Sequence, residues 1–267
     1  MQPGVAISQA IRAAAAGGSP ALVGFLTGGF PDRESFAAQL ESLASAADVV
    51  EVGVPFSDPM ADGATIQRAS RVALGQGVTL AWILEELSRL HGRLRAPLVL
   101  MSYLNPLLAF GLQRLPRAAR DAGVSGFIVP DLPWEECAEL RAALNREDIA
   151  LVQMVTPVTP PARLATLARV SQGFVYAVTA TGTTGGLVEV PDETLDYLDR
   201  VRATAAVPVC AGFGIRHAAQ VARLAGRVDG VIVGSALVEA VEAGMKPATI
   251  LEGMRRIADA GTESRPG

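Results

Sequence analysis

The chain has 267 residues, of which 50% are hydrophobic and 19% are charged, so it has enough apolar side chains for a buried core and too little charge for a disordered chain. Its formal net charge of −4 and its pI near 5.3 argue against nucleic acid or an anionic membrane as the partner, because both require a basic face. A folded protein that binds a small molecule is the expectation.

Short apolar segments recur along the chain, and each is followed by turn-forming residues and then by a segment with helical spacing. The predicted strands cover residues 21–26, 48–52, 98–101, 126–129, 149–154, 174–178, 207–211 and 230–233. The predicted helices cover residues 7–15, 35–47, 80–90, 115–122, 135–144, 162–170, 194–203, 218–224 and 248–260. This alternation predicts βα units and a parallel sheet.

The arrangement of these units favours a closed barrel. Most predicted strands are apolar at nearly every position, which is typical of strands covered on both faces. Eight units fill a chain whose length is close to the roughly 250 residues of a (β/α)8 barrel. We therefore predict one TIM-barrel domain over residues 1–267, with the helix at residues 7–15 closing its bottom and an extra short helix starting near Ser235. An open doubly wound sheet is the alternative, but it needs a G-x-G-x-x-G turn after an early strand, and residues 27–31 read TGGFP.

An acidic residue, Glu51, lies inside the second predicted strand among aliphatic neighbours. Burying an ionised carboxylate is costly unless it is paired or its pKa rises. Glu51 is therefore either a salt-bridged or edge-exposed residue, or a general acid/base whose pKa is raised by burial. The following loop adds Asp58 and Asp62 on the face where such barrels build their active sites. Turn chemistry alone explains many Asp-Pro and Asp-Gly pairs, so position next to Glu51 is what makes these aspartates candidates.

Glycines follow the last two predicted strands, in the segments AGFGI at 211–215 and VGSA at 233–236. Glycine lets backbone amides approach an anion closely, and a helix starting near Ser235 directs its positive end inward. Tight turns explain either segment alone, but together they favour a phosphate site. The loop after the sixth strand, residues 179–186, is rich in Gly and Thr and is interpreted as either a lid over the substrate or a flexible surface loop.

Rare residue types exclude several mechanisms. Lys246 is the only lysine and lies in a Gly-Met-Lys-Pro segment, so a Schiff base is improbable. The two histidines and two cysteines, His91, His217, Cys137 and Cys210, show no metal-ligand spacing, and we expect no metal and no cofactor. Carboxylate side chains are then the remaining candidates for catalysis. With no basic leader segment or long apolar run, and with two separated cysteines, a cytoplasmic location is expected.

Several motifs together resemble the α subunit of tryptophan synthase. They are EVGVPFSDPMADG at 51–63, IQRA at 66–69, Tyr103-x-Asn105-Pro106, VPDLP at 129–133, GFVY at 173–176, GFGI at 212–215 and VGSA at 233–236. The match runs in order over essentially the whole chain, and its first motif is the most specific. The family is a TIM barrel that cleaves indole-3-glycerol phosphate to indole and glyceraldehyde 3-phosphate, with a pyridoxal-phosphate β subunit receiving the indole in an α2β2 assembly.

The resemblance implies roles for individual residues. Glu51 would protonate the indole ring carbon and then take the proton of the side-chain hydroxyl, while Asp62 would stay ionised and hydrogen-bond the ring N–H. The implied wall of the indole slot comprises Phe25, Met101, Tyr103 and Ile128, and Tyr176 matches the family's active-site tyrosine. The implied residues around the phosphate and lid are Thr184, Gly185, Gly212, Phe213, Gly214, Gly234 and Ser235.

Three features depart from the family pattern and keep alternatives open. Residues 27–31 lack the usual aspartate before the proline, the sixth loop reads TGTTGG, and Trp134 replaces a common proline on the face expected to meet the β subunit. A stand-alone lyase that supplies indole to secondary metabolism and a catalytically weak accessory subunit are alternatives to the tryptophan-synthesising α subunit. A sugar-phosphate isomerase or a cyclase that makes the indole compound is disfavoured, because such cyclases rely on a lysine acid.

Overall fold

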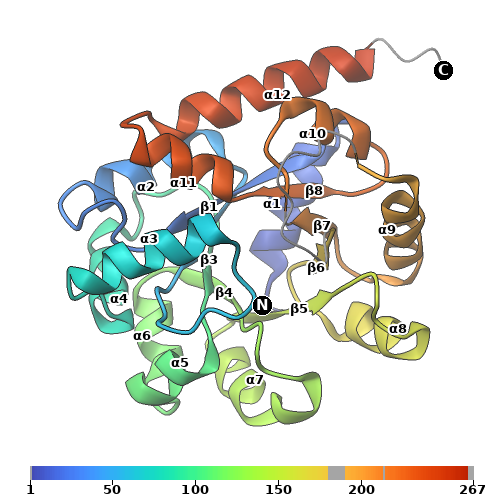
Figure 1. The fold of residues 1–267 in the computed structure, drawn as a ribbon. Coiled ribbons are helices and arrows are strands. Elements are labelled where there is room, and N and C mark those ends of the chain that lie inside the picture. The colour runs from blue at the N-terminus through green and yellow to red at the C-terminus, as the bar shows by residue number, and fades with distance from the viewer. Residues whose placement is uncertain (1, 180–189, 213, 264–267) are drawn as a thin grey trace.

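The computed structural model describes residues 2–179, 190–212 and 214–263, and its eight strands form a closed parallel barrel (Figure 1). The strands are β1 (Ala21–Thr27), β2 (Val49–Gly53), β3 (Leu98–Met101), β4 (Val124–Ile128), β5 (Ala150–Val155), β6 (Val175–Val178), β7 (Val209–Gly212) and β8 (Gly230–Val233). Each strand pairs with the next in sequence, and β8 closes the ring against β1. The predicted (β/α)8 barrel is confirmed, and every predicted strand overlaps an observed one.

Helices surround the strands on the outside of the barrel, except α1, which lies across one end of it (Figure 1). They are α1 (Val5–Ala15), α2 (Phe36–Ala46), α3 (Ala64–Gly75), α4 (Leu80–Leu90), α5 (Leu104–Phe110), α6 (Leu115–Asp121), the 3-10 helix η1 (Trp134–Glu136), α7 (Ala138–Asn145), α8 (Pro161–Val170), α9 (Asp192–Thr204), α10 (Ala218–Leu224), α11 (Ser235–Glu242) and α12 (Pro247–Glu263). The short helix expected near Ser235 is α11. No helix in the described part of the chain is long and apolar enough to cross a membrane.

The strands are buried on both faces, as their apolar sequences predict. All residues of β1, β2 and β7 are buried, since one face packs under the helices and the other fills the barrel. Glu51 is the only acidic or basic residue in the eight described strands. A barrel lined by aliphatic side chains therefore contains a single carboxyl group, and the strand register places it beside Phe25 of β1 and Val99 of β3.

The bottom of the barrel is closed by α1, as predicted. Ile7 and Ile11 are fully buried there, and the Ser8 hydroxyl donates a hydrogen bond to the carbonyl of Gly173 at 2.5 Å. A Cβ at Gly173 would lie 3.2 Å from Ile7 Cδ1, and the residue has a φ of +78°, so a larger side chain would disturb this contact. Closure at the bottom leaves the opposite end, where the strands terminate, as the open end of the barrel.

The helices α3 and α5 were not among the predicted elements. The buried face of α3 consists of Ala69, Ser70 and Ala73, which are too small or polar to produce a clear apolar period. In α5, Pro106 lies in the first turn of a seven-residue helix, where proline is tolerated but masks the pattern. Both helices follow loops at the open end, so they position the residues considered next.

Candidate active site

Glu51 lies inside the barrel near its open end. Its side chain is 1% exposed, and its Oε2 atom has no hydrogen-bond partner among the described residues. Burial and, to a smaller extent, the nearby charge of Asp62 together raise the pKa of Glu51 to about 8. The carboxyl group is therefore protonated at neutral pH, and no arginine among the described residues pairs with it.

Asp62 lies in the loop between β2 and α3, within electrostatic range of Glu51. Burial raises its pKa to about 6, although a hydrogen bond from the Tyr103 hydroxyl favours the charged form. Desolvation outweighs this hydrogen bond, so the pKa of Asp62 is raised. Two carboxyl groups thus sit close together with pKa values of about 8 and about 6, and only Asp62 is mainly ionised at pH 7.

A small cavity adjoins Asp62 at the mouth of the barrel. Its lining comprises Phe25, Thr27, Gly53, Val54, Asp62, Ile66, Ser70, Met101 and Tyr103, and Glu51 is not among these residues. Three of the four residues predicted as the wall of an indole slot are in this set. The fourth, Ile128, is buried beside Met101 in the strand register but does not line the cavity. Gly53 makes room for the ring of Phe25, since a Cβ there would lie 2.5 Å from Phe25 Cζ.

Tyr176, the predicted active-site tyrosine, is buried on β6. Burial raises its pKa well above the usual value, and the charges of Glu51 and Asp62 act in the same direction, so the phenol keeps its proton. A Cβ at Gly212 would lie 2.5 Å from the Tyr176 hydroxyl oxygen. Glycine at position 212, the end of β7, is therefore required for the observed position of the Tyr176 ring. The sequence motif indicated a role near the phosphate and did not indicate this packing role.

The glycine segments predicted to bind phosphate follow the neighbouring strands β7 and β8. Gly214 has a φ of +83°, and its carbonyl accepts a hydrogen bond from the Gln220 side chain at 3.0 Å. Gly234 precedes α11, and Ser235 is the first residue of that helix. The first amides of a helix lack partners within it and carry a partial positive charge, so this end of the barrel suits a phosphate. The predicted residues Thr184, Gly185 and Phe213, and the rest of the loop after residue 179, lie outside the described residues.

One buried polar residue was missed by the sequence reasoning. Thr27 ends β1, is 1% exposed, lines the cavity, and has a hydroxyl without a hydrogen-bond partner in the described part of the chain. An orphaned buried hydroxyl is costly unless a ligand satisfies it. The rule that singled out Glu51, a polar side chain near the open end of an apolar strand, would have found Thr27 as well.

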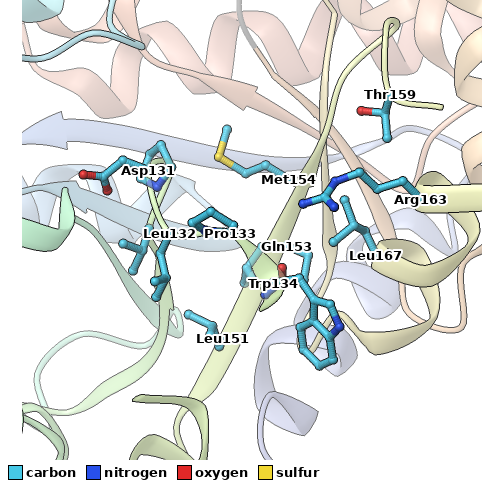
Figure 2. A pocket seen from close by; sticks show the side chains of 13 residues that line it. Asp131, Leu132, Pro133, Trp134, Leu151, Gln153, Met154, Thr159, Arg163 and Leu167 are labelled. Atoms are coloured by element: carbon cyan, nitrogen blue, oxygen red, sulfur yellow. The ribbon is translucent and has the colours of Figure 1, made fainter. Parts of the chain in front are cut away.

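A second hollow, which we call the rim pocket, lies outside β4 and β5 at the open end (Figure 2). Its lining comprises residues 129–134, residues 151–154, Thr159, Arg163 and Leu167. The ring of Trp134 stacks under the Arg141 guanidinium, 4.6 Å from its carbon, and Arg163 pairs with Glu135. Exposed apolar side chains lie on neighbouring loops and helices, namely Met60, Leu108 and Val158. This edge of the barrel has the mixed apolar and charged character of a protein-binding surface.

The lysine and metal-binding chemistry considered above has no counterpart at the carboxyl pair among the described residues, although the buried thiol of Cys210 lies within electrostatic range of Glu51. Lys246 is exposed between α11 and α12. Among the described residues, no group of three or more His, Cys, Asp or Glu side chains is arranged to hold a metal ion. The candidate site is thus an aspartate that lines a small cavity and a buried, protonated glutamic acid within electrostatic range of it, with the glycine segments after β7 and β8 at the same end of the barrel.

Comparison with known proteins identifies a family that this chain resembles along most of its length. A family model described as tryptophan synthase alpha chain matches residues 11–260. A protein of Nitratidesulfovibrio vulgaris named tryptophan synthase alpha chain is 48% identical over 247 residues, covering 92% of this chain and 96% of the relative. One from Chloroflexus aggregans is 44% identical, covering 84% and 85%. A crystal structure of tryptophan synthase from M. tuberculosis superposes with a TM-score of 0.83 at 34% identity, covering 96% of this chain and 98% of that chain.

Proposed function

The chain belongs to the tryptophan synthase alpha chain family, lyases that cleave indole-3-glycerol phosphate to indole and glyceraldehyde 3-phosphate, and we propose that Glu51 and Asp62 carry this reaction. The observation that supports it best is the pair of carboxyl groups with pKa values on opposite sides of neutrality. Neighbouring acids held in different protonation states have different chemical tasks.

The reaction breaks the bond between ring carbon C3 and the glycerol side chain, so the electrons of that bond need an acceptor. Protonated Glu51 donates its proton to C3, and the positive charge spreads to the ring nitrogen. The carboxylate of Glu51 then removes the proton of the side-chain hydroxyl as the oxygen forms a carbonyl. The bonding electrons return to the ring, which restores neutral indole, and Glu51 ends protonated for the next cycle.

Asp62 acts on the positive charge that spreads to the ring nitrogen. Ionised at neutral pH, it accepts a hydrogen bond from the ring N–H and stabilises the cationic intermediate electrostatically. Phe25, Met101 and Tyr103 enclose the ring in the apolar cavity. The amides around Gly214, Gly234 and Ser235 hold the phosphate, which orients C3 toward Glu51.

Incubating the purified protein with indole-3-glycerol phosphate and measuring released indole tests the proposed function. We expect indole and glyceraldehyde 3-phosphate in equal amounts. The assay is run with and without a tryptophan synthase β subunit, which separates an autonomous lyase from a subunit that depends on its partner. Absence of indole in both arms would contradict the assignment.

The proposed roles predict a bell-shaped dependence of kcat on pH. Activity should rise as Asp62 loses its proton near pH 6 and fall as Glu51 loses its proton near pH 8, with a maximum between these values. Saturating substrate is needed, because the substrate phosphate also titrates at about pH 6. A rate that keeps increasing above pH 9 would be inconsistent with Glu51 as the acid.

We further propose that the rim pocket and the exposed apolar residues around it bind a pyridoxal-phosphate-dependent β subunit. The name alpha chain, carried by the relatives, implies an assembly with another kind of chain. Met60, Leu108 and Val158 supply apolar contacts, and Trp134 is a residue type enriched in interfaces. A cytoplasmic location suits a subunit of such a biosynthetic enzyme.

Replacing Leu108 with glutamate should weaken β-subunit binding about tenfold or more, because a charge would be buried in an apolar contact. Leu108 is 50% exposed on α5, and α5 is held beside the rim pocket by the hydrogen bond from Leu104 N–H to the Asp131 carboxylate. Isothermal calorimetry with the β subunit of the same organism measures the change. Ile257→Glu, a similarly exposed position on α12, serves as the control. Equal affinities of the two variants would place the interface elsewhere.

A further inference from the structure

The loop that carries Asp62 is held by a residue from another part of the barrel. Tyr103 follows β3 and is 6% exposed. Its hydroxyl oxygen accepts a hydrogen bond from the Ala61 backbone N–H at 2.9 Å, and its proton is donated to the Asp62 carboxylate. A phenol has one proton and two lone pairs, so with the amide bonded to the oxygen, the proton is directed to the carboxylate.

Other contacts set the position of this phenol. The ring of Tyr103 stacks on Phe56, with 5.2 Å between the centroids, so it packs against the same loop that holds Asp62. The backbone of Tyr103 is also held by Ser102, whose hydroxyl donates a hydrogen bond to the Tyr103 carbonyl at 2.9 Å. Burial and the neighbouring acidic groups raise the pKa of Tyr103 to about 12, so the hydroxyl keeps the proton that it donates.

We propose that Tyr103 is a positioning residue for the reaction: its hydroxyl fixes the Asp62 loop and stabilises the ionised Asp62 carboxylate that faces the indole N–H. This inference rests on the proposed function, since it explains how one carboxyl group in a buried site stays charged. Its consequence is that loss of the hydroxyl should change the ionisation of Asp62 as well as the geometry of the loop.

The charged and titratable groups around Asp62 support this consequence. Among the described residues, the acidic groups Glu51 of β2 and Asp131 after β4 and the phenol of Tyr176 on β6 interact electrostatically with Asp62 or Tyr103. None of these groups supplies a positive charge. The Tyr103 hydroxyl is thus the interaction on this face that favours the ionised carboxylate, against burial and the surrounding acids.

The test is Tyr103→Phe, which keeps the ring and its stacking on Phe56 and removes only the hydroxyl. We expect the acidic limb of the kcat–pH profile to move up by about one pH unit, as expected for losing a hydrogen bond to a charged group. At pH 6 this shift lowers kcat about fivefold beyond any uniform loss. An acidic limb that stays in place would contradict the inference.

Two control variants separate this role from a structural one. Tyr197→Phe removes a buried hydroxyl that has no partner in the described part of the chain, so it repeats the chemical change away from the site and should leave kcat and its pH profile unchanged. Gln67→Met removes the side-chain amide that donates to the Asp62 backbone carbonyl at 2.9 Å. It loosens the same loop without touching the carboxylate, so it should lower kcat uniformly without moving the limb.

A titration that does not depend on turnover makes the two proposals distinguishable. In protein labelled with ¹³C at aspartate Cγ, the Asp62 signal is the one absent from Asp62→Asn, and its midpoint should be higher in Tyr103→Phe than in the wild type. If indole is released but the midpoint does not move, the inference fails and the proposed function stands. If no indole is released but the midpoint moves, the proposed function fails and the hydrogen bond stands.

Discussion

Glu51→Gln is expected to lower kcat by about 10⁴-fold, because the variant can neither donate a proton to C3 nor accept one from the hydroxyl. Glutamine has nearly the same shape, and the carboxyl group that it replaces is neutral at pH 7. Binding of the phosphate end should therefore be unchanged. Steady-state indole release and the affinity for glycerol 3-phosphate, measured on the same preparation, check both expectations.

The matched control for this substitution is Glu85→Gln. Glu85 lies on α4, is 62% exposed in its side chain, and pairs with Arg89. A surface ion pair of this kind contributes little to stability and has no contact with the site. Full activity in Glu85→Gln together with retained activity in Glu51→Gln would remove Glu51 from the mechanism.

Glu51→Gln should also increase the free energy of unfolding, because the pKa of Glu51 is raised in the folded state. The folded state holds the Glu51 proton up to about pH 8, whereas the unfolded chain releases it near the ordinary glutamate pKa of 4.5. The unfolded state then binds fewer protons between these values, so the wild type loses stability as pH rises across this window. Glutamine has no such loss, and the variant should gain about 3 kcal/mol at pH 7 and less than about 1 kcal/mol at pH 5. Urea unfolding at both pH values measures the difference.

A gain that grows with pH would show that the wild type is less stable because it keeps a buried, protonated acid in its core. That is the expected relation between function and stability at an active site. A gain of equal size at both pH values would instead indicate better packing of the amide, unrelated to ionisation.

The barrel could be predicted from the sequence because its signals are local. Each strand is a short apolar run bounded by Gly, Pro or Asp, and burial on both faces leaves no polar alternation to confuse the pattern. Glu51 was predictable for the same reason, since one charged residue in such a run requires an explanation. The small buried face of α3 carried no comparable signal, so that helix was missed.

The environment of Asp62 could not be predicted from the sequence, because it depends on contacts distant in the chain. The amide beside it bonds to Tyr103, 42 residues further along. A motif match placed Tyr103 in the wall of the slot, but its hydrogen bond to Asp62 arises only when β3 ends next to the loop after β2. Desolvation of Asp62 is likewise a property of the closed site, and it explains why its pKa rises when hydrogen bonding alone would lower it.

Asp62→Asn is the second substitution with a large expected effect. The amide can still accept a hydrogen bond from the indole N–H but carries no charge, so stabilisation of the cationic intermediate is lost and kcat should fall about 10²–10³-fold. Because the Asp62 charge contributes to the raised pKa of Glu51, the basic limb of the remaining activity should move to lower pH. The acidic limb due to Asp62 should disappear. Retention of both limbs in Asp62→Asn would assign them to other groups.

Combining Asp62→Asn with Tyr103→Phe tests whether the two residues act together. If the phenol acts through the Asp62 carboxylate, its removal should cost much less in the Asp62→Asn background than in the wild type, giving a clearly non-additive double-mutant cycle. The remaining cost would measure how far the bond to the Ala61 amide holds the loop by itself. Additive losses would mean that Tyr103 acts on the substrate or the fold independently of Asp62, and the carboxylate would then have to keep its charge in the buried site by another contact.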